Sequence, residues 1–171
     1  MTRRIFAVRE TSRPKIVQEI KFLGVKICNE RNLFKEHKKQ VVKKSQRLTN
    51  MTYGIIKKCC NKILIGKVYW KTLALPSILY ALNVTTINEN EIQKLQKFEN
   101  AVYRQILGAP PYAPNCTLRG EIGSSLMKTR IMEGHLQYIR RALQGGNDLI
   151  KEVIRIQLEE NKTRWARITR K

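Results

Sequence analysis

The apolar positions of this chain change their spacing near residue 33. Over residues 14–27 apolar and polar residues alternate imperfectly, which is typical of a short strand or hairpin. From Leu33 onward apolar residues recur three or four positions apart, as they do along a helix with one buried face. The pattern therefore predicts a mainly α protein, in which a short N-terminal β-hairpin or strand precedes a bundle of about five helices.

The first predicted helix covers residues 33–59, and its lysines fall largely outside the apolar stripe. Before it, Gly24 interrupts the strand pattern and suggests a bulge or a close backbone approach. The stripe that we expect to be buried comprises Phe34, His37, Val41, Ser45, Leu48, Met51, Ile55 and Cys59.

Three later segments continue the helical spacing. In residues 63–82 we expect Trp70 to be buried and Pro76 to kink or divide the helix. The next helix is predicted to start at Asn88, with Glu91 completing a capping box, and to end at Gly108. Its expected core positions are Ile92, Leu95, Phe98, Val102 and Ile106.

A further helix follows Ser124 or Ser125, either of which suits an N-cap, and a last helix begins near Asp148. The expected inward-facing residues of the former are Leu126, Met132, Leu136, Ile139 and Leu143. We divide the chain into an N-terminal β element (1–32), a helical bundle (33–108) and a C-terminal helical extension (109–171).

The charge indicates the kind of partner. Lys and Arg number 34 against 13 acidic residues, a formal net charge of +21. Such an excess favours a polyanion, because neutralising phosphates releases condensed counterions. The first candidate partner is nucleic acid, and the second is an anionic membrane surface. Alternatively, the chain is merely a soluble basic protein with no polyanionic partner. The N-terminus has no signal-peptide core and no apolar run is long enough to span a membrane, so we expect an intracellular protein of the nucleus or cytoplasm.

Catalytic chemistry finds little support in this sequence. Asp148 is its one aspartate, whereas two-metal phosphoryl transfer needs several clustered carboxylates. We expect Glu89, Glu91 and Glu99 to lie on a solvated helix face. The four cysteines have no metal-site spacing and suggest small buried apolar residues. The chain alone is therefore predicted to be non-catalytic, with no metal and no cofactor.

Basic clusters are the strongest candidates for a site. A ridge of cations along residues 33–59 could contact phosphates, and the basic end of the chain, residues 164–171, could add to it. The predicted nucleic-acid-binding residues are Lys38, Lys39, Lys43, Lys44, Arg47, Lys57 and Lys58.

Five segments, taken in order, resemble one known arrangement. They are KFLGVKI, LFKEH, YWKTLALPSILYAL, NEIQKLQKFENAVYRQILGAP and LRGEIGSSLMKTR. Together they resemble the region that follows the catalytic palm in reverse transcriptases of LINE-type, non-LTR retrotransposons. The likeness covers residues 15–143, most of the chain.

This resemblance implies a thumb-like helical bundle that holds a template–primer duplex. It also implies a primer-grip-like hairpin near the primer terminus, matched here by Phe22, Leu23, Gly24 and Val25. The paired catalytic aspartates of the family are absent from this chain, as are its endonuclease domain and its cysteine–histidine knuckle.

Three hypotheses remain open from the sequence. The chain is a non-catalytic reverse transcriptase fragment that grips RNA or an RNA–DNA duplex, with the palm as the partner domain in the full-length ancestor. Alternatively, it is part of an active RNA-directed DNA polymerase whose palm lies upstream. In the third hypothesis it is a helical protein-interaction module. Membrane binding is not expected.

Overall fold

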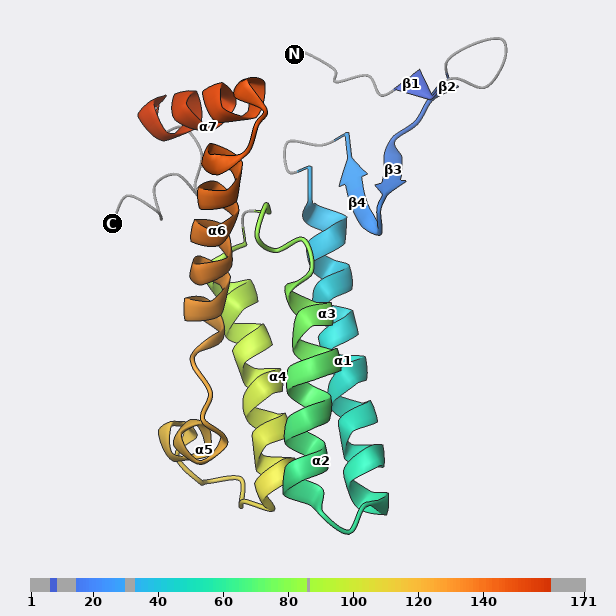
Figure 1. Cartoon of the computed structure of the whole chain (residues 1–171). Coiled ribbons are helices and arrows are strands. Elements are labelled where there is room, and N and C mark those ends of the chain that lie inside the picture. Colours follow the sequence, from blue (N-terminus) through green and yellow to red (C-terminus); the bar gives the residue numbers. More distant parts are fainter. Residues whose placement is uncertain (1–6, 9–14, 30–32, 86, 161–171) are drawn as a thin grey trace.

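A computed structural model of the chain describes residues 7–8, 15–29, 33–85 and 87–160 (Figure 1). It is mainly helical, with an N-terminal antiparallel hairpin followed by helices, which confirms the predicted fold class. The predicted basic end at residues 164–171 lies outside the described residues.

The hairpin joins β3 (Glu19–Phe22) to β4 (Val25–Cys28), with Phe22 opposite Val25. The intervening Leu23 and Gly24 both have positive φ, 45° and 82°, as a two-residue hairpin turn of the primed type requires. Gly24 is thus a turn residue, and the predicted bulge is wrong. A second short pair, β1 (Ala7–Val8) and β2 (Lys15–Ile16), precedes it.

Helix α1 (Lys35–Lys58) is the longest helix described and buries one face. The predicted stripe is confirmed at His37, Val41 and Ser45 but is wrong at Met51, which is 56% exposed. In the second half of the helix the buried positions are instead Thr49, Thr52 and Ile56. The hydroxyls of Ser45, Thr49 and Thr52 each donate to the carbonyl four residues earlier, so these small polar residues pack inside without an unmet hydrogen bond.

The next helical segment consists of α2 (Lys62–Tyr69), the π-helical turn η1 (Trp70–Ala74) and α3 (Leu75–Leu79). Asn61 caps its start by accepting from the Leu64 N–H at 3.0 Å. The wide turn ends two residues before Pro76, which has no N–H to give to the preceding turn, and the chain continues directly into α3. Pro76 therefore does not divide the helix, and Trp70 is buried as predicted.

The capping box of Asn88 and Glu91 begins α4 (Glu89–Leu107), and Gly108 ends it at φ 63°. Both features confirm the prediction, as do the buried Leu95, Val102 and Ile106. The other two expected core positions of this helix, Ile92 and Phe98, are only partly buried.

Helices α5 (Asn115–Ile122), α6 (Met127–Gln144) and α7 (Asp148–Glu160) follow. The predicted inward row of α6 is confirmed at Ile139, while Met132 is only partly buried and Leu126, Leu136 and Leu143 are exposed. The buried residues of this helix are Met127, Ile131, His135 and Ile139. The predicted serine cap is also wrong, since the first N–H of α6, that of Met127, donates to Gln96 Oε1 of α4 at 2.8 Å.

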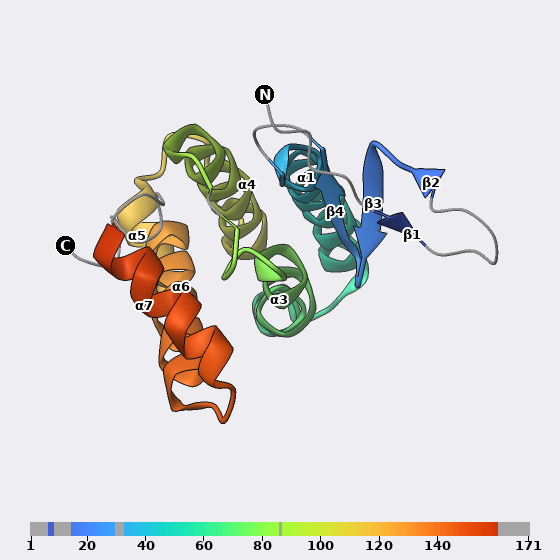
Figure 2. The same ribbon diagram turned by 90° about the horizontal axis from the view of Figure 1, so that it is seen from above.

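Figures 1 and 2 show α1, α4 and the segment α2–η1–α3 side by side as a three-helix bundle, with α6 beside α4 and α7 crossing the end of α6. The hairpin lies over the start of α1. The bundle core also includes Leu118, Ile122, Met127 and Ile131 of α5 and α6. The core therefore continues across the boundary that we place between residues 108 and 109; whether the two regions are separate domains stays a prediction.

Two glycines in the bundle should respond oppositely to alanine. A Cβ at Gly66 would lie 2.7 Å from Ile106 Cγ1, whereas nothing lies within 4 Å of a Cβ at Gly54. We expect Gly66→Ala to lower the free energy of unfolding by about 1–2 kcal/mol, because overpacking outweighs the gain in helix propensity. Gly54→Ala, on the exposed face of α1, should raise it by about 0.5–1 kcal/mol. Urea titrations of both variants measure this; a Gly66→Ala variant as stable as the wild-type chain or more stable would contradict the packing at Gly66.

Candidate nucleic-acid interface

The exposed side of α1 carries five of the predicted cations. At 100° per residue they fall within about a third of the helix circumference, and at 1.5 Å per residue they span about 28 Å. All five are exposed. We call this surface the α1 ridge; it consists of Lys39, Lys43, Arg47, Lys57 and Lys58.

The ridge cations differ in their neighbours. The Lys39 ammonium lies 2.6 Å from the carboxylate of Glu36, and this hydrogen bond lowers the pKa of Glu36. Lys57 lies over the ring of Tyr53, 4.5 Å from its centroid. The structure shows no ion pair or hydrogen bond of Lys43, Arg47 or Lys58 with any other residue that it describes. Those three charges are available to a ligand.

Two predicted residues do not belong to the ridge. Lys38 is only 3% exposed, and its ammonium lies 3.9 Å from the Glu91 carboxylate of α4. It sits where α1 faces α4, so its prediction as a phosphate contact is wrong for this fold. Lys44 is exposed but donates to the Ser77 carbonyl of α3 at 3.0 Å, so it bridges two helices at the flank of the ridge.

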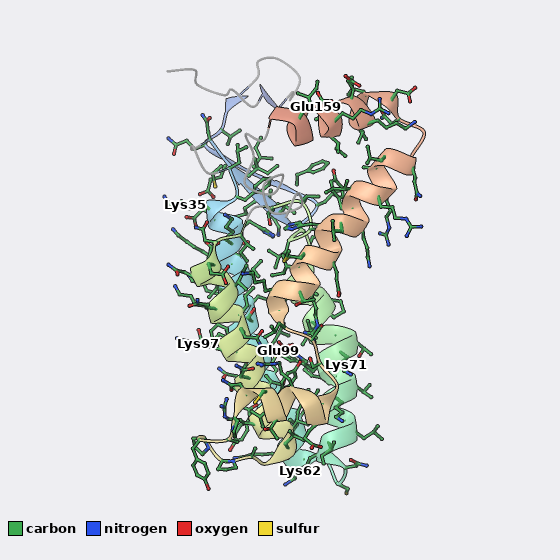
Figure 3. All side chains as sticks on the ribbon, turned by 90° about the vertical axis from the view of Figure 1, so that its left-hand side faces the viewer. Lys35, Lys62, Lys71, Lys97, Glu99 and Glu159 are labelled. Atoms are coloured by element: carbon green, nitrogen blue, oxygen red, sulfur yellow. The ribbon has the colours of Figure 1, made fainter. Side chains whose placement is uncertain are left out.

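Helix α4 adds cations that were not predicted from the sequence. Lys94 and Lys97 are both exposed and share one face of α4 at a spacing of three residues. In Figure 3, Lys97 and Lys35, at the start of α1, point to the same side of the molecule, while Lys71 of η1 points to the opposite side. Cations of both α1 and α4 therefore lie on the same side of the molecule. In the sequence, Lys94 and Lys97 could have been recognised as surface cations because they lie outside the apolar stripe of Leu95, Val102 and Ile106.

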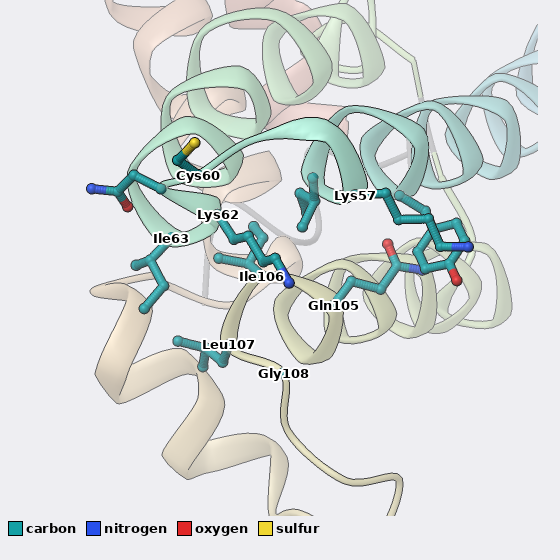
Figure 4. Close-up of a pocket in the computed structure, with 11 residues that line it drawn as sticks. Lys57, Cys60, Lys62, Ile63, Gln105, Ile106, Leu107 and Gly108 are labelled. Carbon is teal, nitrogen blue, oxygen red and sulfur yellow. The ribbon is translucent and has the colours of Figure 1, made fainter.

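A groove of about 730 Å³ opens where the ridge ends. It lies between the last turns of α1 and α4 and the first turn of α2 (Figure 4). Its polar lining includes Lys57 of α1, Lys62 of α2 and Gln105 of α4, together with Tyr53 and Asn61. The groove therefore continues the basic surface rather than forming a separate site.

The hairpin tip holds the predicted primer-grip-like residues. Phe22 and Leu23 are 62% and 74% exposed, while Val25 is partly buried. The Tyr80 hydroxyl, just past α3, donates to the Leu23 carbonyl at 2.7 Å and ties the tip to the bundle. The tip is thus fixed in position with an apolar surface facing outward.

Glu99 of α4 is fully buried, so its predicted place on a solvated helix face is wrong. Its carboxylate forms an ion pair with Arg130 of α6 and accepts from the Tyr103 hydroxyl at 2.5 Å. Arg130 and Tyr103 also contact the Ser124 hydroxyl. Burial, with the adjacent negative charge of Glu99, raises the pKa of Tyr103 to about 12. The network joins α4 to α6 and occupies the carboxylate, so we assign it a structural role.

The structure also shows where the cysteines lie and whether the described residues could form a metal site or a membrane-spanning helix. The cysteine prediction is confirmed at Cys28, which is buried, and is wrong at Cys60 and Cys116, which are exposed. In the described ranges, no group of three His, Cys, Asp or Glu side chains could hold a metal ion. Within the same ranges, no helix combines the length and apolar character needed to cross a bilayer.

No protein-family model, curated protein or solved structure matches this chain.

Proposed function

We propose that this chain grips the backbone of RNA or an RNA–DNA duplex through the α1 ridge, as a non-catalytic fragment related to the thumb of LINE-type reverse transcriptases. The observation that carries the proposal is that Lys43, Arg47 and Lys58 present, on one side of α1, positive charges that are unpaired within the described part of the chain. They are exposed, aligned on one helix, and unpaired with any residue that the structure describes.

The geometry of α1 suits a duplex backbone. The helix is anchored through its buried face, and its cations extend over about 28 Å, so they can contact several backbone phosphates at once. Glu36, already paired with Lys39, is the acidic residue of α1. Long cationic side chains on such a face contact phosphates and fix position without reading bases. We therefore expect little sequence preference.

The related polymerase hypothesis receives support from the hairpin tip. Phe22 and Leu23 expose apolar surface at a fixed position, which would be covered if a palm domain packed there in a longer polypeptide. In that case the catalytic aspartates would come from the palm. Paired aspartates in the reading frame upstream, together with primer extension by the longer product, would support this alternative; a frame without them would oppose it.

The helical protein-interaction module is favoured by a different surface. Leu64, Val68 and Leu73 are 59%, 52% and 62% exposed on α2 and η1. Contiguous exposed apolar side chains are typical of protein contacts. A stoichiometric protein complex that survives high salt and retains no nucleic acid would favour this function over the ridge proposal.

Salt dependence tests the ridge proposal most directly. For three to five phosphate contacts, the plot of log K against log salt concentration should have a slope of about −3 to −5, since each contact contributes about −0.9. Fluorescence anisotropy with a labelled RNA–DNA duplex measures this slope. An affinity that does not change with ionic strength would contradict backbone binding.

The double variant Lys43→Ala, Arg47→Ala should reduce the magnitude of that slope by about 2. Arg140→Ala, Arg141→Ala is the matched control, because it removes two exposed cations from α6. Equal loss in both double variants would show that binding follows the net charge and not the ridge.

A further inference from the structure

The groove at the end of the α1 ridge has two chemically different parts. Its interior is apolar, formed by the buried Ile56 and Ile106 and by the more accessible Ile63 and Leu107. Its edge is positive, because Lys57 comes from the last turn of α1 and Lys62 from the first turn of α2. No carboxylate is among the described residues that line it. This combination suits a ligand with an apolar body and an anionic group.

Gln105 adds an unmet hydrogen-bonding group. Its Oε1 is buried and has no hydrogen-bond partner among the residues that the structure describes. A buried amide oxygen without a partner is costly, and such atoms usually have a protein, water or ligand partner. A half-turn of the amide exchanges its oxygen and nitrogen, so the side chain can present an acceptor or a donor. In Figure 4 Gln105 extends from α4 toward Lys57 across the groove.

The aromatic ring of Tyr53 completes the lining on the α1 side. It is 46% exposed, and the Lys57 ammonium holds a position 4.5 Å from its centroid. Aromatic rings beside cations are the usual platform for bases of single strands, with the cations meeting the backbone. Lys57 belongs to both the ridge and the groove, which makes the two surfaces continuous.

We propose that this groove binds one unpaired nucleotide at the end of the duplex held on the α1 ridge. The base lies in the apolar interior, the Gln105 amide meets its hydrogen-bonding edge, and its phosphate lies between Lys57 and Lys62. A nucleobase has the flat apolar faces and polar edge that this lining requires. The inference rests on the proposed function and adds to it a preference for duplexes with a single-stranded end.

Three labelled RNA–DNA duplexes test this inference: one blunt, one with a short adenosine overhang, and one whose overhang has the same phosphates but abasic sugars. We expect the wild-type chain to bind the adenosine overhang about tenfold more tightly than the abasic one. Gln105→Leu should remove most of this preference and leave the affinity for blunt duplex unchanged. Gln93→Leu, an exposed glutamine of α4 outside the groove, is the control and should retain the preference.

Equal affinity of the wild-type chain for the adenosine and abasic overhangs would overturn the nucleotide site while leaving ridge binding intact. Failure to bind any of the three duplexes would instead contradict the proposed function. Fluorescence of 2-aminopurine in the overhang, measured with the wild-type chain, does not depend on variant folding. We expect its emission to change on binding when it replaces the overhang adenosine but not when it replaces a paired adenosine; no difference would also overturn the inference.

Discussion

Replacing Arg130 by alanine is expected to lower the free energy of unfolding by about 3–5 kcal/mol, because it leaves the Glu99 carboxylate buried without its cation. Glu99 is fully buried on α4, and Arg130 of α6 is 15% exposed, so water does little to compensate the lost partner. The variant should also loosen α6 from α4, since this ion pair joins the two helices. Urea unfolding followed by circular dichroism measures the loss.

The chain offers a matched control for this pair. Lys128 and Glu89 also connect α6 to α4, at 3.3 Å, but both side chains are about half exposed. Lys128→Ala should therefore cost no more than about 1 kcal/mol. The double variant Glu99→Met, Arg130→Met removes both charges and should recover much of the stability that Arg130→Ala loses. Similar costs for Arg130→Ala and Lys128→Ala would contradict the burial of the Glu99 network.

Local signals in the sequence predicted the helices well. The Asn88–Glu91 capping box and the positive-φ Gly108 each act within a few residues of their own end of α4, so the bounds of this helix follow from local chemistry. The choice of buried face in α6 was harder, because Leu126, Leu136 and Leu143 provide a second apolar row. Packing against α4 and the segment after α3 selects the row of Met127 and Ile131, and His135 Nε2 lies 2.9 Å from the Leu82 carbonyl. That selection depends on partners distant in the sequence.

The candidate site was predictable only in part for the same reason. Lys39 and Lys43 follow from the helical period alone, because they lie opposite the buried stripe. Lys38 directly precedes Lys39 in the sequence. Only the packing of α4 against α1 makes Lys38 an interior residue, beside Glu91. The burial of Glu99 likewise requires Arg130, which lies 31 residues later. An isolated glutamate in a polar helix sequence gives no sign of such a partner.

Charge reversal on the α1 ridge should have the largest effect on binding. We expect Lys43→Glu, Arg47→Glu, Lys58→Glu to weaken binding of an RNA–DNA duplex at least about a hundredfold at low salt, because three attractive phosphate contacts become repulsive. All three side chains are exposed, so each substitution should change stability by no more than about 0.5 kcal/mol. Fluorescence anisotropy measures the affinity, and thermal unfolding checks that the variant is folded.

The decisive comparison is a reversal of equal charge elsewhere. Arg140→Glu, Arg141→Glu, Arg155→Glu changes the net charge by the same amount on exposed positions of α6 and α7. If long-range attraction by a basic protein explained binding, both triple variants would weaken it equally, since each lowers the net charge of +21 to +15 by exchanging three cations for three anions. A backbone-gripping ridge instead requires that the α6–α7 variant retain most of its affinity. The ratio of the two affinities therefore separates contact at α1 from general electrostatic attraction, and a ratio near one would contradict the ridge.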